Sequence, residues 1–303
     1  MKWFLASDLH LRGERPRARL DEDWLQTQKD MLLEIGELCG VHDVNGLILV
    51  GDIFDHPRVS TEVLNMTVGM LQNPHIPEVF VVAGNHDLVG HNIENLNQCS
   101  IGVLRQVFSG PDELAIRAGN AKAWDFNTED PSYYLCGVQY VHQLIFKDEK
   151  SRPPTDKGRT ADELLDYLPH AKWIFCGDMH QHFHHTRTDN GIERHVVNMG
   201  LTIRQKASEL AYEPSVVLFD DEAETVERLK LTDDPAMVTR EHLEVAEARE
   251  GRIDAFMEKM STTGAVTLSF MDNLEAKIAT TDLEPDVAFE LNEIINLTKQ
   301  ESK

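Results

Sequence analysis

Four short polar motifs carry residue types that bind divalent metal ions. They are Asp8-Leu9-His10, Gly51-Asp52-Ile53-Phe54-Asp55, Gly84-Asn85-His86-Asp87 and Gly177-Asp178-Met179-His180. Carboxylate and amide oxygens suit hard ions such as Mg²⁺ and Mn²⁺, and imidazole shifts the preference towards Mn²⁺, Fe²⁺ or Zn²⁺. A set that mixes Asp, Asn and His therefore predicts a transition-metal site more than a calcium site.

Two ions held close together by such residues would hydrolyse phosphate esters. Alternate residues of an extended segment point the same way, so Asp8 and His10 can reach one ion. A carboxylate such as Asp52 can bridge two ions through its two oxygens, which a single imidazole cannot do. Ions roughly 3.5–4 Å apart activate water as a nucleophile at neutral pH and stabilise the phosphoryl transition state. The motifs therefore predict phosphate-ester hydrolysis.

Each motif follows a short apolar run that we interpret as a strand buried on both faces. The four runs are residues 2–7, 46–50, 79–83 and 173–176. Apolar residues at helical spacing predict a helix over residues 23–39, and Ser60 is the expected N-cap of a second helix that ends near Leu71. This alternation of strands and helices predicts an α/β sheet, with the motifs where strands end.

The rest of the chain adds further strands and a second domain. We expect a strand over residues 133–141, a helix over 161–168, a hairpin around Asp189-Asn190-Gly191, and a strand pair over 215–219 and 225–231. A charged helix over 239–260 and a strand over 265–270 follow. The predicted organisation is a catalytic domain over residues 1–232 and a small C-terminal α/β module over 233–303, which either packs on the catalytic domain or docks a partner.

Charge limits the substrates that the chain can hold alone. The 303 residues carry a formal net charge of −23, and residues 220–303, with 21 acidic and 9 basic side chains, contribute −12 of it. An acidic surface repels phosphate backbones, so we expect another subunit to help if the substrate is DNA. Two local basic clusters could guide phosphate or could be ordinary solvated loops: Arg12, Arg15, Arg17 and Arg19, and Lys147, Lys150, Arg152, Lys157 and Arg159.

Targeting signals and cysteines point to an intracellular protein. The first apolar run is too short for a signal peptide, and no later run approaches the length of a membrane span. Cys39, Cys99, Cys136 and Cys176 lack the spacing of a zinc knuckle and the density of a disulfide scaffold. We expect a soluble cytoplasmic protein with reduced thiols and no membrane partner, in the host cytoplasm if the chain is of phage origin.

The ordered series of motifs resembles the calcineurin-like metallophosphoesterase superfamily. Within it, the series is similar to the SbcD-type nuclease subunits that partner SMC-like ATPases such as SbcC in bacteria and phages. The resemblance covers about residues 1–230. It implies a four-layer fold, a two-sheet sandwich flanked by helices with the metals at one edge. It also implies two divalent ions, with Mn²⁺ expected and Mg²⁺ as the alternative.

The resemblance also implies a role for each motif residue. It places Asp8, His10 and His180 on a first ion, Asp52 as the bridge, and Asn85 and His142 on a second ion. The alternative for His142 is a loop or core histidine. Because the family usually has Gly-His-x-His where this chain has Gly177-Asp178-Met179-His180, a carboxylate stands in place of an imidazole. We expect Asp178 to ligate the second ion, and the alternative is that His182 takes over.

The expected catalytic residues are His86 and Asp55. In the family the histidine that matches His86 protonates the leaving oxygen, and the carboxylate that resembles Asp55 orients such a histidine and raises its pKa. The alternative for Asp55 is a turn carboxylate before Pro57. Asp87 is expected to brace its loop. Arg204, near the turn at Asn198-Met199-Gly200, is expected to pair with a surface carboxylate more than to touch substrate.

Three functions stand as alternatives. The leading one is a Mn²⁺-dependent DNA exonuclease and endonuclease subunit of a recombination and repair complex, with DNA, an SMC-family ATPase and a second copy of the chain as partners. The second is a phosphodiesterase or phosphatase that acts on nucleotides or other small molecules. The third is a non-catalytic scaffold with a degenerate metal site. Retention of the motif residues favours an enzyme over a scaffold.

Overall fold

The computed structural model describes residues 1–76, 78–108, 117–118, 133–135 and 138–241, together with scattered positions between 243 and 295. The chain forms two compact units, Met1–Arg240 and Glu241–Lys303. The first unit contains all four motifs. The strand expected over residues 265–270 and most of the helix expected over 239–260 lie outside the described residues. The boundary expected at 232/233 stays a prediction.

A six-stranded sheet forms one half of the first unit. Its order is β13-β12-β1-β2-β3-β4. The strands are β1 (Lys2–Ala6), β2 (Gly46–Val50), β3 (Val79–Val82), β4 (Arg117–Ala118), β12 (Ser215–Asp220) and β13 (Thr225–Lys230). β1 to β4 are parallel, and β12 pairs antiparallel with both β1 and β13. The carboxyl ends of β1, β2 and β3, where three motifs follow, therefore lie at the same edge.

A five-stranded sheet forms the other half, in the order β10-β11-β9-β6-β5. Its strands are β5 (Tyr133–Leu135), β6 (Val138–His142), β9 (Trp173–Gly177), β10 (Phe183–Asp189) and β11 (Ile192–Asn198). β6, β9 and β11 are parallel neighbours. The short strands β7 (Ile145–Phe146) and β8 (Arg159–Thr160) form a separate parallel pair.

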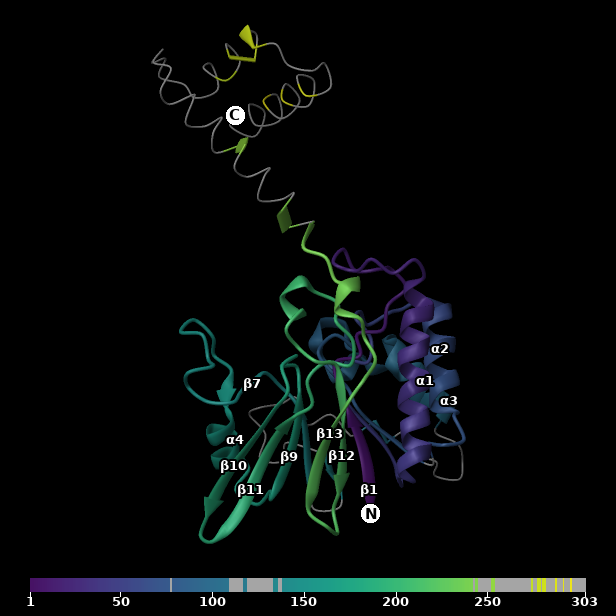
Figure 1. Cartoon of the computed structure of the whole chain (residues 1–303), viewed down its shortest axis with the longest axis vertical. Helices are drawn as coiled ribbons and strands as arrows, with labels where there is room; N and C mark the ends of the chain where they lie inside the picture. Colours follow the sequence, from purple (N-terminus) through teal and green to yellow (C-terminus); the bar gives the residue numbers. More distant parts are fainter. Residues whose placement is uncertain are drawn as a thin grey trace. The chain divides into compact units, whose positions relative to one another are not determined.

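Helices cover the outer faces of both sheets. They are α1 (Trp24–His42), α2 (Thr61–Leu71), α3 (Ser100–Phe108) and α4 (Ala161–Tyr167). Ser60 caps α2 as predicted, with its side chain accepting from the N–H of Val63, and Asp23 caps α1. Shorter 3₁₀ turns are Val89–His91, Ile93–Gln98, Ala207–Glu209 and Pro235–Met237. Figure 1 shows α1, α2 and α3 on one side of the two sheets and α4 on the other.

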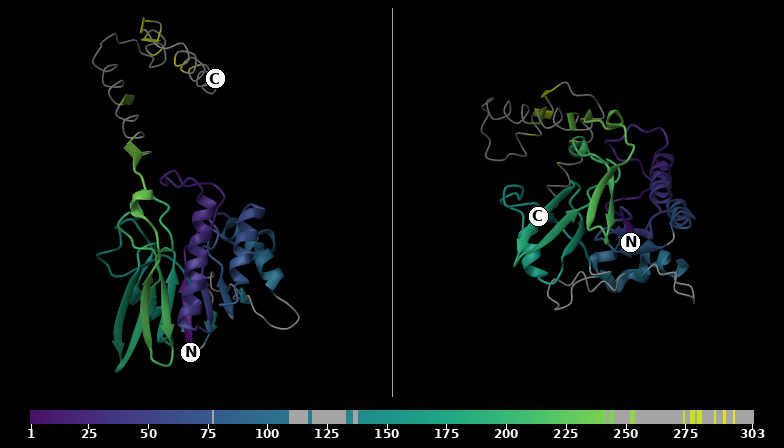
Figure 2. Two further views of the ribbon diagram at one scale, coloured as in Figure 1. Left: turned by 45° about the vertical axis from the view of Figure 1, so that its right-hand side comes forward. Right: turned by 60° about the horizontal axis from the view of Figure 1, so that its bottom comes forward.

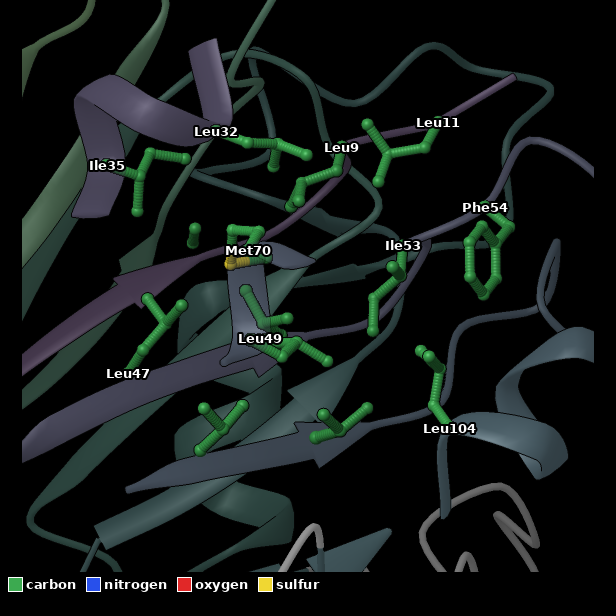
Figure 3. Close-up of a cluster of buried hydrophobic side chains, with 14 of the residues drawn as sticks. Leu9, Leu11, Leu32, Ile35, Leu47, Leu49, Ile53, Phe54, Met70 and Leu104 are labelled. Atoms are coloured by element: carbon green, nitrogen blue, oxygen red, sulfur yellow. The ribbon is translucent and has the colours of Figure 1, made fainter. Parts of the chain in front are cut away.

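Alternation along the strands builds the four layers. Trp3 and Leu5 belong to the core between the sheets, while Phe4 packs in the core beneath α1 and α2. In β9, Phe175 faces the core between the sheets and Ile174 faces the core beneath α4. The core beneath α1 and α2 continues through the labelled leucines and isoleucines of Figure 3. The predicted α/β sandwich with helices on its outer faces is confirmed, and Figure 2 shows it from two further directions.

Two local predictions had different outcomes. The hairpin around Asn190-Gly191 is confirmed: both residues have positive φ, 51° and 80°, as a two-residue hairpin turn requires. The single strand expected over residues 133–141 is wrong. β5 and β6 pair antiparallel with each other, because Tyr133 lies opposite Tyr140 and Leu135 opposite Val138. The run over residues 133–141 contains Gly137 and Gln139, and its remaining apolar residues do not distinguish one strand from two.

A buried ionic cluster closes the end of the first unit. Asp233, whose side chain is 1% exposed, accepts from Arg19 at 2.7 Å and from Arg204 at 2.9 Å. Arg19 also pairs with Asp21. Arg204 thus pairs with a carboxylate as predicted, although with a buried one. Asp233, the carboxylate that pairs with Arg204, lies at the predicted domain boundary. Its contact with Arg19 joins residues 233–239 to the loop after β1. In the same loop, the N–H of Leu20 donates to the carbonyl of Met237.

The sequence also predicts reduced thiols and no membrane-spanning segment. Cys39, Cys99 and Cys176 are buried free thiols, and Cys136 lies outside the described residues. None of the described helices combines the length and the apolar character that crossing a bilayer requires.

Candidate metal centre

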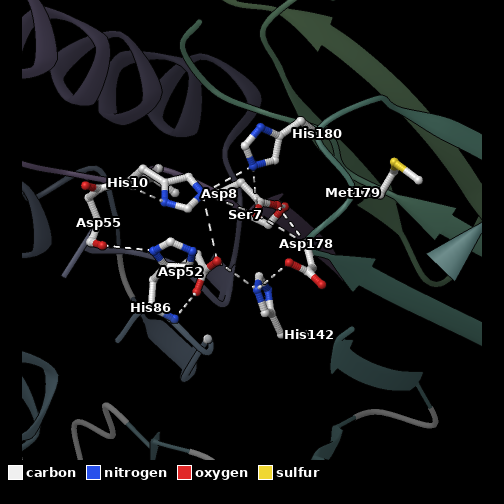
Figure 4. A network of polar contacts seen from close by, with 12 residues as sticks. Ser7, Asp8, His10, Asp52, Asp55, His86, His142, Asp178, Met179 and His180 are labelled. Carbon is white, nitrogen blue, oxygen red and sulfur yellow. Dashed lines mark hydrogen bonds and ion pairs between the residues drawn. The ribbon is translucent and has the colours of Figure 1, made fainter. Parts of the chain in front are cut away.

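The predicted site residues converge at one edge of the two sheets. Each follows or ends a strand: Asp8 after β1, Asp52 after β2, Asn85 after β3, His142 at the end of β6, and Asp178 and His180 after β9. Figure 4 shows the side chains of Asp8, His10, Asp52, His142, Asp178 and His180 near a common centre, with Met179 pointing away. Three groups of potential ligand atoms lie within 4.8 Å of one another, namely Asp8, His10 and His180; Asp8, Asp52 and His142; and His10, Asp55 and His86.

The first group has separations that fit one ion. His10 Nε2 lies 3.2 Å from His180 Nε2 and 3.8 Å from Asp8 Oδ1, and His180 Nε2 is also 3.8 Å from that oxygen. Asp52 Oδ2 is 3.8 Å from His10 Nε2. Ligand atoms about 2.1 Å from a shared ion lie about 3.0–3.4 Å apart in octahedral or tetrahedral geometry. These four residues could hold a divalent ion after small adjustments.

The second group lies deeper. His142 Nε2 is 3.1 Å from Asp52 Oδ2 and 4.0 Å from Asp178 Oδ1, and the His142 side chain is fully buried. Its Nδ1 donates to the carbonyl of Val50 at 2.8 Å, which turns Nε2 towards the carboxylates. Asn85 Oδ1 is buried without a hydrogen-bond partner among the described residues. A cation bound by Asn85 would satisfy that oxygen.

Asp8 belongs to both groups, and one oxygen of Asp52 from the second group also lies 3.8 Å from His10 Nε2 of the first. Asp52 Oδ1 accepts the backbone N–H of His86 at 2.9 Å, and Oδ2 faces both His10 and His142. A carboxylate oxygen that accepts one N–H keeps a second lone pair, so the expected bridge through both oxygens stays a prediction. Gly84 allows this contact: a Cβ there would lie 2.0 Å from Asp52 Oδ1. A Cβ on Gly51, whose φ is +82°, would lie 2.1 Å from His142 Nδ1.

Left-handed backbone directs the ligands. Asp8, His10, Asp52 and Asp178 have φ of 54°, 45°, 50° and 83°. Asp8 and His10 therefore do not lie on an extended segment as expected. Backbone hydrogen bonds hold the loop instead, since the N–H groups of Asp8 and His10 donate to the carbonyls of Gly51 and Asp52. Such conformations cost about 1–3 kcal/mol each and cluster at functional sites.

The electrostatics of the centre call for a cation. Burial by itself would lower the pKa of His142, but the carboxylates of Asp52, Asp8 and Asp178 raise it to about 10. Burial would raise the pKa of Asp52, yet His142 and His10 hold that pKa below its usual range. The carboxylates thus draw a proton onto the buried imidazole. A divalent ion would supply that positive charge in its place.

The structure separates Asp178 from His182. Asp178 Oδ1 faces His142, and burial raises the pKa of this carboxyl group. Neither Asp178 nor His182 belongs to the three ligand groups formed by the described residues. Burial and the nearby cation of Arg228 lower the pKa of His182 to about 4. The 4.0 Å separation of Asp178 Oδ1 from His142 Nε2 supports Asp178 of the two alternatives, and the choice stays a prediction.

His86 and Asp55 meet differently from the expectation. His86 Nδ1 donates to the backbone carbonyl of Asp55 at 2.9 Å, whereas the Asp55 carboxylate lies 2.8 Å from Arg12 and 3.6 Å from His10 Nδ1. Asp55 therefore orients His86 through its main chain, because the turn after β2 points the carboxylate towards the first motif. The pKa of Asp55 would be raised by burial, but His10 and Arg12 lower it.

Asp87 braces two motifs, as expected. It is fully buried, and its oxygens accept the N–H groups of Gly84 at 2.7 Å and Phe54 at 2.8 Å. It thereby fixes the loop that carries Asn85 against the loop that carries Asp52. Burial and the charge of Asp52 raise the pKa of Asp87 to about 7.

Sequence reasoning missed Glu209. This residue ends the 3₁₀ turn Ala207–Glu209, is 2% exposed, and places Oε1 2.6 Å from His180 Nδ1. Gln205, from the same loop, donates to the carbonyl of His10 at 3.0 Å. Nothing in the spacing reveals these contacts, since 29 residues separate Glu209 from His180.

A cavity of about 100 Å³ opens beside the first group. It is lined by Asp8, His10, Arg12, Asp55, His86, His180, Leu201, Ile203, Gln205, Lys206 and Glu209. Of the two basic clusters, only Arg12 lines it. Arg19 is buried in the ionic cluster, Arg15 donates to the carbonyl of Asp21, and Arg152 pairs with glutamates. His86 and Arg12 thus line the cavity through which a substrate could reach the carboxylates of Asp8 and Asp55.

Comparison with known proteins identifies the family. The model of the calcineurin-like phosphoesterase family matches residues 1–182, which contain all four motifs. The chain belongs to the calcineurin-like phosphoesterase family. No curated protein matches this phosphoesterase in sequence. A solved structure described as a novel archaeal phosphodiesterase is similar, with a TM-score of 0.39 and 14% identity over 76% of this chain and 100% of that chain.

Proposed function

We propose that this calcineurin-like phosphoesterase is a two-metal phosphodiesterase. One observation carries the proposal: Asp52 Oδ2 lies between His10 Nε2 and His142 Nε2, so a single carboxylate oxygen faces two sets of ligand atoms. Asp8 and His180 complete the first set, and Asn85 and Asp178 complete the second. When bound, the ions would polarise phosphoryl oxygens and lower the pKa of water.

The proposed proton donor is His86. Because its Nδ1 carries the hydrogen that is donated to the Asp55 carbonyl, Nε2 is the atom left to exchange a proton. His86 lines the cavity, and its ring centroid lies 4.9 Å from that of His10. A protonated Nε2 would protonate the leaving alkoxide, and the main-chain contact with Asp55 would keep the ring in position.

Arg12 is the proposed contact for the substrate phosphate. Gln28, a fully buried residue of α1, bonds both the N–H and the carbonyl of Arg12, at 2.9 and 2.8 Å. Asp55 holds one end of the guanidinium. An arginine fixed at backbone and side chain needs little further ordering to bind an anion. Lys206 is the other cationic residue that lines the cavity.

DNA is the proposed substrate, with Mn²⁺ as the proposed metal. The resemblance of the four motifs to SbcD-type nucleases supports both assignments. The net charge of −23 supports the further proposal that an SMC-family ATPase subunit or a second copy of the chain helps to hold DNA. Nuclease turnover measured with and without a purified SMC-type ATPase tests the partner, and stimulation by the ATPase is the expected result.

A nucleotide or another small phosphodiester is the second candidate. The cavity of about 100 Å³ favours it, because a small diester fits such a space more readily than a duplex does. The acidic chain also repels a small monoanion less strongly than a polyanion.

Turnover assays with Mn²⁺ separate these candidates. Single-stranded DNA, duplex DNA, cyclic nucleotides and bis-p-nitrophenyl phosphate are compared for wild type, Asp52→Ala and the control His170→Ala, which changes an exposed histidine. Cleavage of DNA by wild type and by the control, with none by Asp52→Ala, is expected. Intact DNA with rapid cleavage of a nucleotide would replace DNA by the second candidate. No cleavage of any ester by a metal-loaded chain would overturn the hydrolase proposal.

A further inference from the structure

The residue pair Glu209 and His180 stands out because a buried charge is costly unless it is well partnered. Glu209 is 2% exposed, and both of its oxygens have specific partners. Oε1 lies 2.6 Å from His180 Nδ1, and Oε2 accepts the backbone N–H groups of Gln205 at 2.7 Å and Lys206 at 2.9 Å. A carboxylate held in this way has one fixed orientation.

The contact determines which nitrogen of His180 carries the hydrogen. A carboxylate only accepts, so Nδ1 must be the donor, and in the neutral imidazole the lone pair is then on Nε2. Nε2 is the atom that lies 3.2 Å from His10 Nε2 and 3.8 Å from Asp8 Oδ1. An imidazole that binds a metal through one nitrogen commonly donates the other N–H to a carboxylate or carbonyl, which fixes the ring and makes the ligand more basic.

The same loop also holds the second histidine of the group. Gln205 donates to the carbonyls of Leu9 at 3.3 Å and His10 at 3.0 Å, and its own N–H is held by Glu209. One loop, residues 205–209, therefore orients both histidines. Glu209 holds the ring of His180, and the side-chain amide of Gln205 holds the backbone carbonyl of His10.

We propose that Glu209 is a positioning residue that fixes the Nδ1–H form of His180 and so presents Nε2 to an ion held with Asp8, His10 and Asp52. This inference rests on the proposed metal centre. Glu209 lies outside the matched region 1–182. In this proposal it supports metal binding through His180 without itself contacting the ion or the substrate.

Glu209→Gln tests the role with little change of shape. The amide keeps one acceptor oxygen, so it cannot serve His180 and the two backbone N–H groups at once. Titration with Mn²⁺ followed by calorimetry is expected to show about a 10–100-fold weaker affinity for one of two equivalents, with the other unchanged. Glu37→Gln, which changes an exposed carboxylate of α1, is the matched control and should bind both equivalents as wild type does.

The tautomer of His180 gives a readout that does not depend on metal. Nitrogen-15 NMR of the metal-free wild-type protein should show His180 protonated at Nδ1 with a strongly deshielded proton, and Glu209→Gln should lose that signal or mix the tautomers. The wild-type spectrum alone decides the matter if the variant fails to fold. A wild-type His180 that carries its hydrogen on Nε2 and none on Nδ1, or unchanged affinity for both equivalents in Glu209→Gln, would overturn the proposal. A wild-type chain that binds no Mn²⁺ would instead overturn the proposed function, and the tautomer would still test the role of Glu209.

Discussion

The two halves of the metal centre are supported in different ways. The histidine of the half that lines the cavity, His180, is backed by the carboxylate of Glu209. The histidine of the deeper half, His142, is backed by the neutral carbonyl of Val50 in strand β2. A carboxylate increases the basicity of an imidazole more than a carbonyl does. We infer that sharing Asp52 would not make the two proposed ion positions equivalent, because the histidines of the two halves have different outer contacts.

The residue common to both halves should give the largest effect. Asp52→Ala is expected to abolish binding of both ions and to lower turnover by about 10³-fold or more, because several kcal/mol of transition-state stabilisation depend on the ions. Metal content by mass spectrometry and diester turnover measure this. His170→Ala serves as the control, and thermal unfolding verifies the fold. Retention of one tightly bound ion by Asp52→Ala would show that the halves are independent.

Changing one histidine at a time should show which Mn²⁺ equivalent each half of the proposed centre binds. His180→Ala and His142→Ala are each expected to weaken one equivalent of Mn²⁺ by more than about 100-fold, since each loses an inner ligand. Because of the contact with Glu209, the equivalent lost in His180→Ala should be the tighter one. Calorimetric titration of both variants measures this. Loss of the same equivalent in both variants would contradict the assignment of the two histidines to different ions.

His86 belongs to neither half as a ligand in the proposal. His86→Ala should keep both ions and lose about 10²-fold in turnover, because proton transfer to the leaving group is lost. The third ligand group places His86 within 4.8 Å of His10 and Asp55 ligand atoms, so release of an ion from His86→Ala would reassign it as a ligand.

The smallest effect is expected at the ionic cluster behind the cavity-lining half. Burial would raise the pKa of Asp21, but the two hydrogen bonds from Arg19 and one from Thr27 hold that pKa below its usual range. The stability that Asp21 contributes is therefore present above its unfolded pKa of about 3.9 and is lost as the pH falls through the lower folded pKa.

Asp21→Asn tests this pH dependence. It should cost about 1 kcal/mol in the free energy of unfolding at neutral pH, and the difference from wild type should shrink below about pH 4. Urea unfolding at several pH values measures the difference. An equal deficit at low and neutral pH would show that packing, and not charge, explains the effect of the substitution.

Sequence reasoning predicted the parts of the centre that depend on strand order. Asp8, Asp52 and Asn85 each follow an apolar run, and parallel strands bring their carboxyl ends to one edge, so the convergence of these residues follows from their positions in the chain. The N-cap at Ser60 and the turn at Asn190-Gly191 are local signals, and both appear in the structure.

The parts that were missed depend on turns and distant contacts. Asp55 meets His86 with its carbonyl, because the backbone of the turn after β2 decides which group faces the imidazole. Glu209 reaches His180 from a 3₁₀ turn that has no periodicity to detect. β5 and β6 pair antiparallel with each other, although their residue types predict a single strand. In each case the contact depends on the direction of the backbone. The residue types alone do not determine that direction.

The left-handed turns at the ligands set a condition for transplanting this chemistry. Grafting Asp-Leu-His and Gly-Asp onto another parallel sheet would reproduce the residue types, yet an ordinary backbone would aim the side chains elsewhere. Asp8, His10 and Asp52 owe their direction to positive φ and to hydrogen bonds between neighbouring loops. A design would have to copy those loops together with Gly84, which leaves room for the Asp52 carboxylate. What must be transferred is the backbone conformation, because the sequence motif alone does not produce it.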